Sequence, residues 1–434
     1  MKILFATMPF DGHFNPLTGL AVHLQEKGHD VRWYTGPTYA NKLRELGIAH
    51  YPFDRARDVN AQNLVEIFPD YAKLGSGPKA IEFALTRIFF GNLEAHYRDV
   101  VALHAEFPFD AFVCDGAFYA ARLIAEKLQP RVYPIGPAPT PTATSKTAPP
   151  PFFGLKPATS IFGGLRDRIV KAMLASSTKS GKKLLNDLLA REGLPPFTGS
   201  VFDLPFERAK TFFQIGVPGM DYPRQDFPKN FRFVGPLVPR RKTGAKGFGQ
   251  KDKLRKYPSL IVVSQGTVDN RDPEKLFVPS LEALKGGPHL VVATTGGRNT
   301  EGLRRRFPED NIVVEDFIDF DLLLEHADLF ICNGGYGSIM QALVKGVPIL
   351  SAGKLEGKSD INARLDWRGL GLDLQTERPT PKKIAAGVAR VLGNPRILEN
   401  VARVKAELES YRPFEIIEGI LLEDYEAAGR EGAS

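Results

Sequence analysis

The chain has 434 residues, which is too long for one ordinary hydrophobic core and predicts two domains. Hydrophobic residues make up 43% and charged residues 25%, a globular composition that excludes extensive disorder. The formal net charge of +7 suits nucleic acid, a membrane surface or an anionic small molecule as partner. No apolar run is long enough to span a bilayer. Two cysteines, Cys114 and Cys332, predict neither a disulfide framework nor a metal site, so we expect a cytoplasmic protein.

Short apolar runs alternate with longer helical patterns from the N-terminus onward. Met1–Phe5 is too short for a secretory signal and predicts a buried strand, and Leu17–Lys27 predicts a helix after it. Near-continuous apolar strands separated by helices are typical of parallel sheets covered on both faces. We expect a first sheet from Ile3–Ala6, Val31–Tyr34, Phe112–Cys114 and Val132–Ile135, and a second from Leu260–Ser264, Leu290–Thr294, Ile312–Val314, Leu329–Cys332 and Pro348–Leu350.

Two stretches between these elements favour irregular structure. The prolines of Phe233–Pro239 oppose a helix, and the basic stretch 240–256 that follows predicts an exposed linker in preference to a nucleic-acid site. This predicts domains at 1–235 and 254–413 with a linker at 236–253. Pro137–Gly164 predicts a long loop that is a lid, a wall of the acceptor site or an ordinary surface excursion. A last helix is expected at Phe414–Ala427.

The loop after the first strand contains a candidate general base. His13 follows Gly12, and a ligand in an open α/β sheet binds at the carboxyl ends of the strands. Histidine is the usual general base at neutral pH and needs a carboxylate to hold its tautomer. Asp115 ends another predicted strand and is the candidate partner. His13 is alternatively an ordinary surface histidine.

A glycine-rich turn from strand to helix contains a candidate anion site. The segment Cys332–Leu343 could present the N–H groups of Gly334 to Ser338 to a diphosphate. Gly266 and Thr267, after the first strand of the second half, could add donors. A polar loop, Gly353–Arg364, could bind sugar hydroxyls. Each feature is compatible with an ordinary turn, cap or solvated loop, but their order describes an enzyme with two substrates on two domains.

At these residues the chain resembles the GT-B glycosyltransferases that include plant, antibiotic-modifying and macrolide UDP-glycosyltransferases. Residues 5–36 resemble the start of that family and residues 317–365 its donor-binding signature. The resemblance implies an α/β fold with two Rossmann-like domains facing across a cleft, inverting transfer and no required metal. It also implies that His13 is the catalytic base, that Asp115 is its helper, and that the helix after Pro413 returns to the first domain.

The same resemblance assigns the two substrate sites. It implies donor contacts from Gly266, Thr267, Phe317, Asn333, Gly334, Gly335, Tyr336, Gly337, Ser338, Gln341, Glu356, Lys358 and Ser359. We expect the acceptor to lie against Phe10, Asp11, Phe14, Phe152 and Phe153. The domain at 1–235 would then bind the acceptor, with residues 414–434 packed on it, and the domain at 254–413 the donor.

Three positions depart from the family pattern and bear on the donor. Asn333 stands where the signature has histidine, Gln341 where a glutamate commonly holds the ribose, and Lys358-Ser359 where an Asp-Gln pair contacts glucose. These replacements put UDP-glucose in doubt. The segment with Leu355–Lys358 resembles a bacterial subgroup that includes flavonoid rhamnosyltransferases, which favours a dTDP-linked deoxysugar.

The expected reaction is inverting transfer from UDP-glucose or a dTDP-rhamnose-type donor to a hydroxyl of a hydrophobic small molecule, such as a flavonoid or another phenol. The nucleotide sugar is a co-substrate that leaves as UDP or dTDP, and no cofactor, metal, nucleic acid or stable membrane insertion is expected. Two alternatives stay open: a sugar-nucleotide epimerase of the same architecture and a non-catalytic sugar-nucleotide-binding protein. A lipid acceptor at a membrane surface is a further variant.

Overall fold

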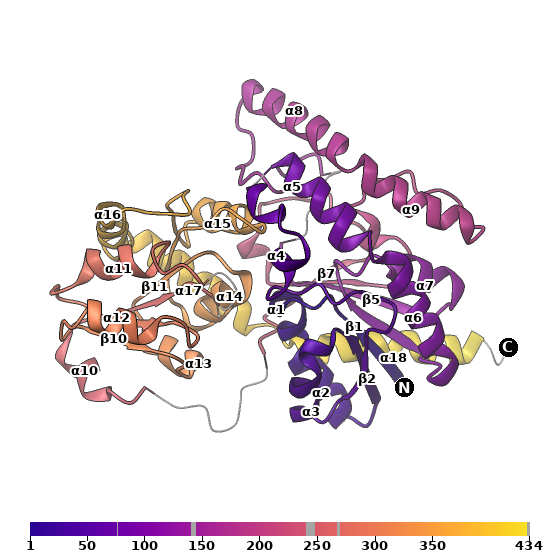
Figure 1. Cartoon of the computed structure of the whole chain (residues 1–434), viewed down its shortest axis with the longest axis horizontal. Helices are drawn as coiled ribbons and strands as arrows, with labels where there is room; N and C mark the ends of the chain where they lie inside the picture. Colours follow the sequence, from indigo (N-terminus) through magenta and orange to yellow (C-terminus); the bar gives the residue numbers. More distant parts are fainter. Residues whose placement is uncertain (76, 140–144, 240–247, 267–269, 432–434) are drawn as a thin grey trace.

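The computed structural model describes residues 1–75, 77–139, 145–239, 248–266 and 270–431. Its strands form two separate sheets, and Figure 1 shows one on each side of the molecule. The first sheet has seven parallel strands in the order β3-β2-β1-β4-β5-β6-β7. They span β1 Lys2–Ala6, β2 Asp30–Thr35, β3 Ala49–Pro52, β4 Ala111–Asp115, β5 Arg131–Gly136, β6 Phe212–Ile215 and β7 Phe231–Gly235.

The second sheet has six parallel strands in the order β10-β9-β8-β11-β12-β13. They span β8 Leu260–Ser264, β9 Leu290–Thr294, β10 Ile312–Glu315, β11 Leu329–Cys332, β12 Ile349–Ser351 and β13 Gly371–Asp373. In both sheets the chain starts at a central strand, runs to one edge and then crosses to the other side. This is the Rossmann order, and the ligand crevice lies where the order reverses, between β1 and β4 and between β8 and β11.

The apolar strands are buried on both faces, as the sequence pattern predicts. In β1, Ile3 and Phe5 belong to one hydrophobic cluster, and Leu4 and Ala6 belong to another. Successive side chains of a strand point to opposite faces, so a sheet covered by helices on both sides needs apolar residues at every position. Both faces of the first sheet are therefore closed to solvent at its centre, and the strand ends are left for binding.

The helices connect the strands and cover the faces. In the first half they are α1 Asp11–Phe14, α2 Thr18–Glu26, α3 Ala40–Glu45, α4 Leu64–Ile67, α5 Pro78–Phe83, α6 Leu93–Glu106, α7 Ala121–Lys127, α8 Ile161–Ser177 and α9 Lys179–Arg191. In the second they are α10 Lys251–Lys256, α11 Phe277–Leu284, α12 Thr300–Arg306, α13 Phe320–Leu324, α14 Tyr336–Lys345, α15 Lys358–Trp367, α16 Pro381–Leu392, α17 Pro395–Glu409 and α18 Pro413–Glu431. Within the described residues, none of these helices combines the length and the apolar character needed to cross a bilayer.

The last helix returns to the first sheet. Figure 1 shows α18 running beneath the N-terminal half, where it contacts α2 and β7. His23 Nε2 lies 2.8 Å from Glu418 Oε2, and the Tyr133 hydroxyl donates to Asp424 Oδ2 at 2.8 Å. The polar contacts of α18 thus hold the C-terminus on the first domain. The exact domain limits stay predictions, and residues 240–247 of the predicted linker lie outside the described residues.

Three sequence expectations need correction. The predicted loop Pro137–Gly164 ends earlier, because the Ser160 side chain accepts from Gly163 N and caps α8, which begins at Ile161. The strand expected from Pro348 begins at Ile349, since proline has no N–H to donate to a ladder. The first sheet has seven strands instead of four, because β3, β6 and β7 were not recognised from the sequence, and the second has six instead of five, because β13 was not recognised.

Candidate active site

His13 and Asp115 meet at the crevice of the first sheet. His13 lies in α1, directly after β1, and Asp115 is the last residue of β4. The distance from His13 Nδ1 to Asp115 Oδ1 is 2.9 Å. The carboxylate is 1% exposed and also accepts from Met8 N at 2.7 Å and Ala117 N at 2.8 Å. Backbone donors therefore fix the carboxylate that orients His13.

This geometry leaves one imidazole nitrogen for chemistry. An ionised carboxylate only accepts hydrogen bonds, so Nδ1 of His13 carries the proton and Nε2 keeps its lone pair. The His13 side chain is 24% exposed, whereas the Asp115 side chain is fully buried. The Phe10 ring lies beside the His13 imidazole, with ring centroids 5.9 Å apart. The arrangement can accept a proton from a hydroxyl that enters the crevice.

The crevice of the second sheet is lined by amides and glycines. The Asn333 side chain, after β11, donates to the Gln265 carbonyl, after β8, at 2.7 Å. Gly266 and Gly334 have φ values of +78° and +92°, which favour glycine. Gly335 is the N-cap of α14, whose first N–H groups and positive dipole end suit a phosphate. Thr267, which we expected to contact the nucleotide-sugar donor, lies outside the described residues.

The remaining predicted donor residues fall into two groups. In α14, the Ser338 hydroxyl donates to Gly335 O at 2.9 Å, the Gln341 side chain donates to Gly337 O at 3.4 Å, and the Tyr336 hydroxyl donates to Ile215 O at 2.8 Å. The Tyr336 contact joins the two domains, because Ile215 belongs to β6 of the first sheet. Gly337 is exposed at the first turn of this helix.

The second group lies after β10 and at the start of α15. Phe317 is 71% exposed, and its ring lies within 3.2 Å of the Cβ position of Gly297 at the end of β9. Lys358 is buried, and its ammonium group donates to Glu356 Oε2 at 2.9 Å. The Lys358 charge is thus already paired with a carboxylate. Ser359 lies against Gly154 of the first domain.

The predicted acceptor residues do not all face the crevice. Phe14 is fully buried; its ring stacks on Tyr39 with centroids 4.1 Å apart and packs at a tilt against Trp33 with centroids 4.6 Å apart. Its assignment to the acceptor site is wrong, because the short helix α1 turns its ring into the core. Asp11 accepts from the Tyr39 hydroxyl at 3.1 Å and lines a cavity. Phe10 is partly exposed, and its contact with the acceptor stays a prediction.

Phe152 and Phe153 lie in a loop that the second domain holds in place. The Asp360 carboxylate of α15 accepts from Phe152 N and from Gly154 N, the latter at 2.8 Å. Burial raises the pKa of the Asp360 carboxyl, while Arg364 and the backbone donors act in the opposite direction. Asp360 directly follows Lys358 and Ser359. The loop with the predicted acceptor residues is therefore attached to the helix with the predicted donor residues.

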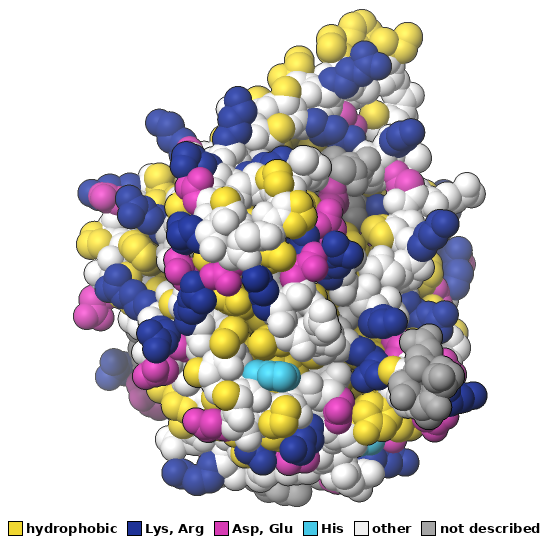
Figure 2. Space-filling model, turned by 90° about the vertical axis from the view of Figure 1, so that its right-hand side faces the viewer, with side chains coloured by type: hydrophobic (Ala, Val, Ile, Leu, Met, Phe, Trp, Pro, Cys, Tyr) yellow, Lys and Arg dark blue, Asp and Glu magenta, His cyan; other side chains and the backbone are white. Residues whose placement is uncertain are grey.

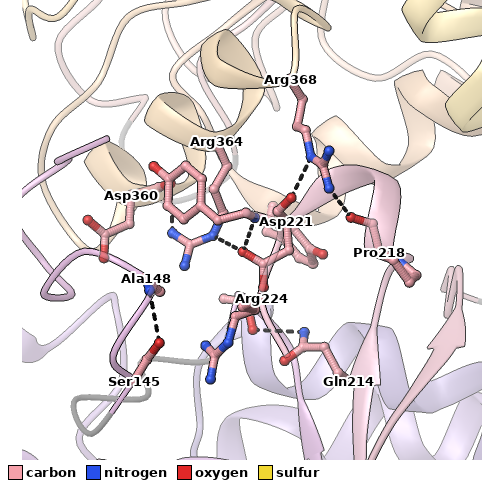
Figure 3. A network of polar contacts seen from close by, with 12 residues as sticks. Ser145, Ala148, Gln214, Pro218, Asp221, Arg224, Asp360, Arg364 and Arg368 are labelled. Carbon is pink, nitrogen blue, oxygen red and sulfur yellow. Dashed lines mark hydrogen bonds and ion pairs between the residues drawn. The ribbon is translucent and has the colours of Figure 1, made fainter. Parts of the chain in front are cut away.

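A buried ion pair also joins the domains, and no motif in the sequence indicates it. Figure 3 shows Arg364 and Arg368, at the end of α15, directed toward the Asp221 region of the first domain. Arg364 Nε donates to Asp221 Oδ1 at 2.6 Å, and its guanidinium lies 4.5 Å from the centroid of the Tyr222 ring. Arg368 donates to the carbonyls of Asp221 and Pro218.

A polar cavity of about 300 Å³ opens between the two halves. Asp11, Tyr39 and Lys42 line it from the first domain, and Arg271 and Arg298 from the second. Pattern reasoning missed both arginines, because each stands in a loop without a motif. Among the residues that the structure describes, no group of three or more His, Cys, Asp or Glu side chains is placed to hold a metal ion.

Comparison with known proteins identifies the family. Residues 281–422 match the family described as erythromycin biosynthesis protein CIII-like, C-terminal domain. The chain is 33% identical to the 4'-demethylrebeccamycin synthase of Lentzea aerocolonigenes over 410 residues, which cover 94% of this chain and 95% of that protein. The chain belongs to the UDP-glycosyltransferase-like family of antibiotic and macrolide glycosyltransferases.

Other relatives agree with this assignment. This chain is 27% identical to UDP-glycosyltransferase 2 of Phaeomoniella chlamydospora, over 94% of this chain and 92% of that protein. The solved glycotransferase of kitacinnamycin superposes with a TM-score of 0.71 at 20% identity, covering 96% and 98% of the two chains. The predicted GT-B fold is confirmed. The protein is a transferase that uses nucleotide sugars to glycosylate natural products, which decides against the epimerase and the non-catalytic alternatives.

Proposed function

We propose that this glycosyltransferase inverts the anomeric carbon while it moves a sugar from a UDP-glucose or dTDP-rhamnose type of donor to a hydroxyl of a hydrophobic small molecule, such as a flavonoid or another phenol. The observation that carries the proposal is the 2.9 Å contact between His13 Nδ1 and Asp115 Oδ1 at the crevice of the first sheet. It provides a general base whose tautomer is fixed before the acceptor arrives.

The proposed step balances in protons and electron pairs. The acceptor O–H gives its proton to His13 Nε2 as the oxygen forms a bond to the anomeric carbon. The bond from that carbon to the diphosphate oxygen breaks on the opposite face, and the nucleoside diphosphate leaves with the electron pair. Asp115 stabilises the imidazolium that forms. The N–H groups of Gly334–Ser338 stabilise the charge on the leaving phosphate.

Two features of the site support the proposed substrates. A diphosphate suits the start of α14, where glycines allow close approach and the helix dipole is positive. An apolar acceptor suits the partly buried rings of Phe10, Phe152 and Phe153 near the crevice. At the position where an Asp-Gln pair commonly contacts glucose, this chain has Lys358, which is paired with Glu356. The replacement of that Asp-Gln pair supports a dTDP-linked deoxysugar as an alternative to UDP-glucose.

A transfer assay tests the proposal. We would incubate the protein with UDP-glucose or dTDP-rhamnose and a panel of flavonols and other phenols, then measure the acceptor mass and the anomeric configuration of the product by NMR. We expect a gain of one sugar, inversion, and no loss of activity when EDTA is present. His13→Ala should lower turnover about 100-fold or more while sparing donor binding, measured by calorimetry. Unchanged turnover in that variant, or retention of configuration, would sink the mechanism.

A further inference from the structure

Helices α8 and α9 follow each other almost in line, joined at Thr178, and form an arm that projects from the first domain. Figure 1 shows α8 at the top of the molecule, away from both sheets. One side of α8 packs against α5 and α9, and Leu174 on that side is 2% exposed. The opposite side has no cover from the described residues. α8 therefore presents one helix face to its surroundings.

That face has a continuous row of large apolar side chains. Ile161, Leu165, Ile169 and Met173 recur every fourth residue and so lie on one side of the helix. Their exposed fractions are 91%, 55%, 55% and 43%, and the neighbouring Phe162 is 84% exposed. Figure 2 shows hydrophobic side chains at the upper tip of the molecule, beside Lys and Arg side chains. Exposed apolar groups in a contiguous row mark a binding surface.

The same two helices concentrate positive charge. Residues 161–191 include seven Lys or Arg and two Asp side chains, a net charge of +5, where the whole chain has +7. At 100° per residue, Arg166 and Arg168 lie on the two flanks of the apolar row, and Arg166 also pairs with Asp167. An apolar stripe flanked by basic residues is the pattern of a helix that lies in the interface of an anionic bilayer.

We propose that the α8–α9 arm is a reversible docking surface for an anionic lipid bilayer. The row Ile161–Met173 enters the boundary between headgroups and acyl chains, and the basic side chains lie against lipid phosphates. A second copy of the chain fits this surface poorly, because it would bring a charge of +5 against +5. The contact is peripheral, because the row lies on the surface of one helix.

Vesicle sedimentation with the full chain tests this surface. We would compare vesicles of phosphatidylcholine alone with vesicles that also contain phosphatidylserine, at low and at physiological salt. The double variant Leu165→Glu with Ile169→Glu removes the stripe. The matched control is Leu398→Glu, which changes a leucine of α17 that is 44% exposed in the other domain. A second pair, Arg168→Gln with Lys179→Gln, removes charge and leaves the stripe intact.

We expect the wild type to bind the anionic vesicles, more weakly at higher salt, and to leave neutral vesicles mostly unbound. The stripe variant should bind at least about tenfold more weakly, and the Leu398→Glu control should bind as the wild type does. Transfer to a water-soluble acceptor should be unchanged in all variants, which shows that they fold. The proposal is overturned by a wild type that does not sediment with anionic vesicles, or by a stripe variant that binds equally well. A dimer in light scattering that the stripe variant abolishes, without vesicle binding, would assign the surface to a second copy.

Discussion

Replacing Asp115 by asparagine tests the active site at its most buried group. The Oδ1 atom accepts from His13 Nδ1 and Ala117 N, and Oδ2 accepts from Met8 N. An asparagine has one oxygen and one NH₂ group in place of two oxygens. If the asparagine oxygen keeps the hydrogen bonds from His13 Nδ1 and Ala117 N, its NH₂ group faces the Met8 N–H, and two donors then oppose each other. In the flipped orientation, the NH₂ group faces His13 and moves the imidazole proton to Nε2.

Both orientations have a cost that the contacts allow us to estimate. A buried donor without an acceptor costs about 1–3 kcal/mol, so we expect Asp115→Asn to lower the free energy of unfolding by that amount. The loss of the negative charge beside the imidazolium, and of the proton acceptor in the flipped form, should lower kcat by about 10²–10⁴-fold. Donor binding should be unchanged, because Asp115 lies in the first sheet and the diphosphate cradle in the second.

The assay separates catalysis from stability with a matched carboxylate. Asp99 is 4% exposed, accepts from the Tyr34 hydroxyl at 2.7 Å and from backbone N–H groups, and has no hydrogen bond to His13. Asp99→Asn should therefore lower the free energy of unfolding, measured by urea denaturation, about as much as Asp115→Asn does. Its kcat should stay close to that of the wild type. If Asp115→Asn keeps the wild-type kcat, or if both variants lose kcat equally, the orienting role of Asp115 is refuted.

Three further variants have definite expectations. Gly334→Ala should weaken donor binding in calorimetry, because φ is +92° and the new Cβ would lie 2.3 Å from Asn362 Oδ1. Arg364→Leu should lower the free energy of unfolding by about 3–5 kcal/mol in denaturant titration, since it leaves the buried Asp221 carboxylate unpaired. Burial raises the pKa of the Asp373 carboxyl from 3.8 to about 6. The protonated carboxyl therefore contributes its full stabilisation of the folded state below pH 3.8, and this stabilisation is lost as the pH rises through 6. Asp373→Asn should therefore gain stability relative to the wild type as denaturation is repeated from pH 4 to pH 7.

Each of these predictions has its own control. Gly302→Ala places a Cβ in open space and should leave donor binding unchanged, so an equal loss there would contradict the steric argument. Arg364→Lys keeps the charge and should retain more stability than Arg364→Leu; the reverse order would contradict the unpaired-carboxylate argument. A difference between Asp373→Asn and the wild type that stays constant across the pH series would show that the Asp373 carboxyl does not titrate as expected.

Local patterns predicted the central strands and the helices between them, because these depend on short apolar runs and on period. These patterns failed at Phe14, because predicting a contact with the acceptor required knowing whether the short helix α1 directs this ring into the crevice or into the core. The apolar loop after β1 is equally compatible with a ring in the crevice and a ring in the core. Only packing against Tyr39 and Trp33 decides between them.

The sequence by itself determined the two α/β halves, the family, and the pairing of a histidine loop with a strand-end aspartate. These follow from residue types at fixed spacing, which can be recognised before the tertiary structure is known. The tertiary structure alone decided that Asp360 holds the Phe152 loop and that Asp221 pairs with Arg364, contacts between residues more than 100 positions apart. Such contacts depend on how two domains pack, and no local pattern records the packing of one domain on another.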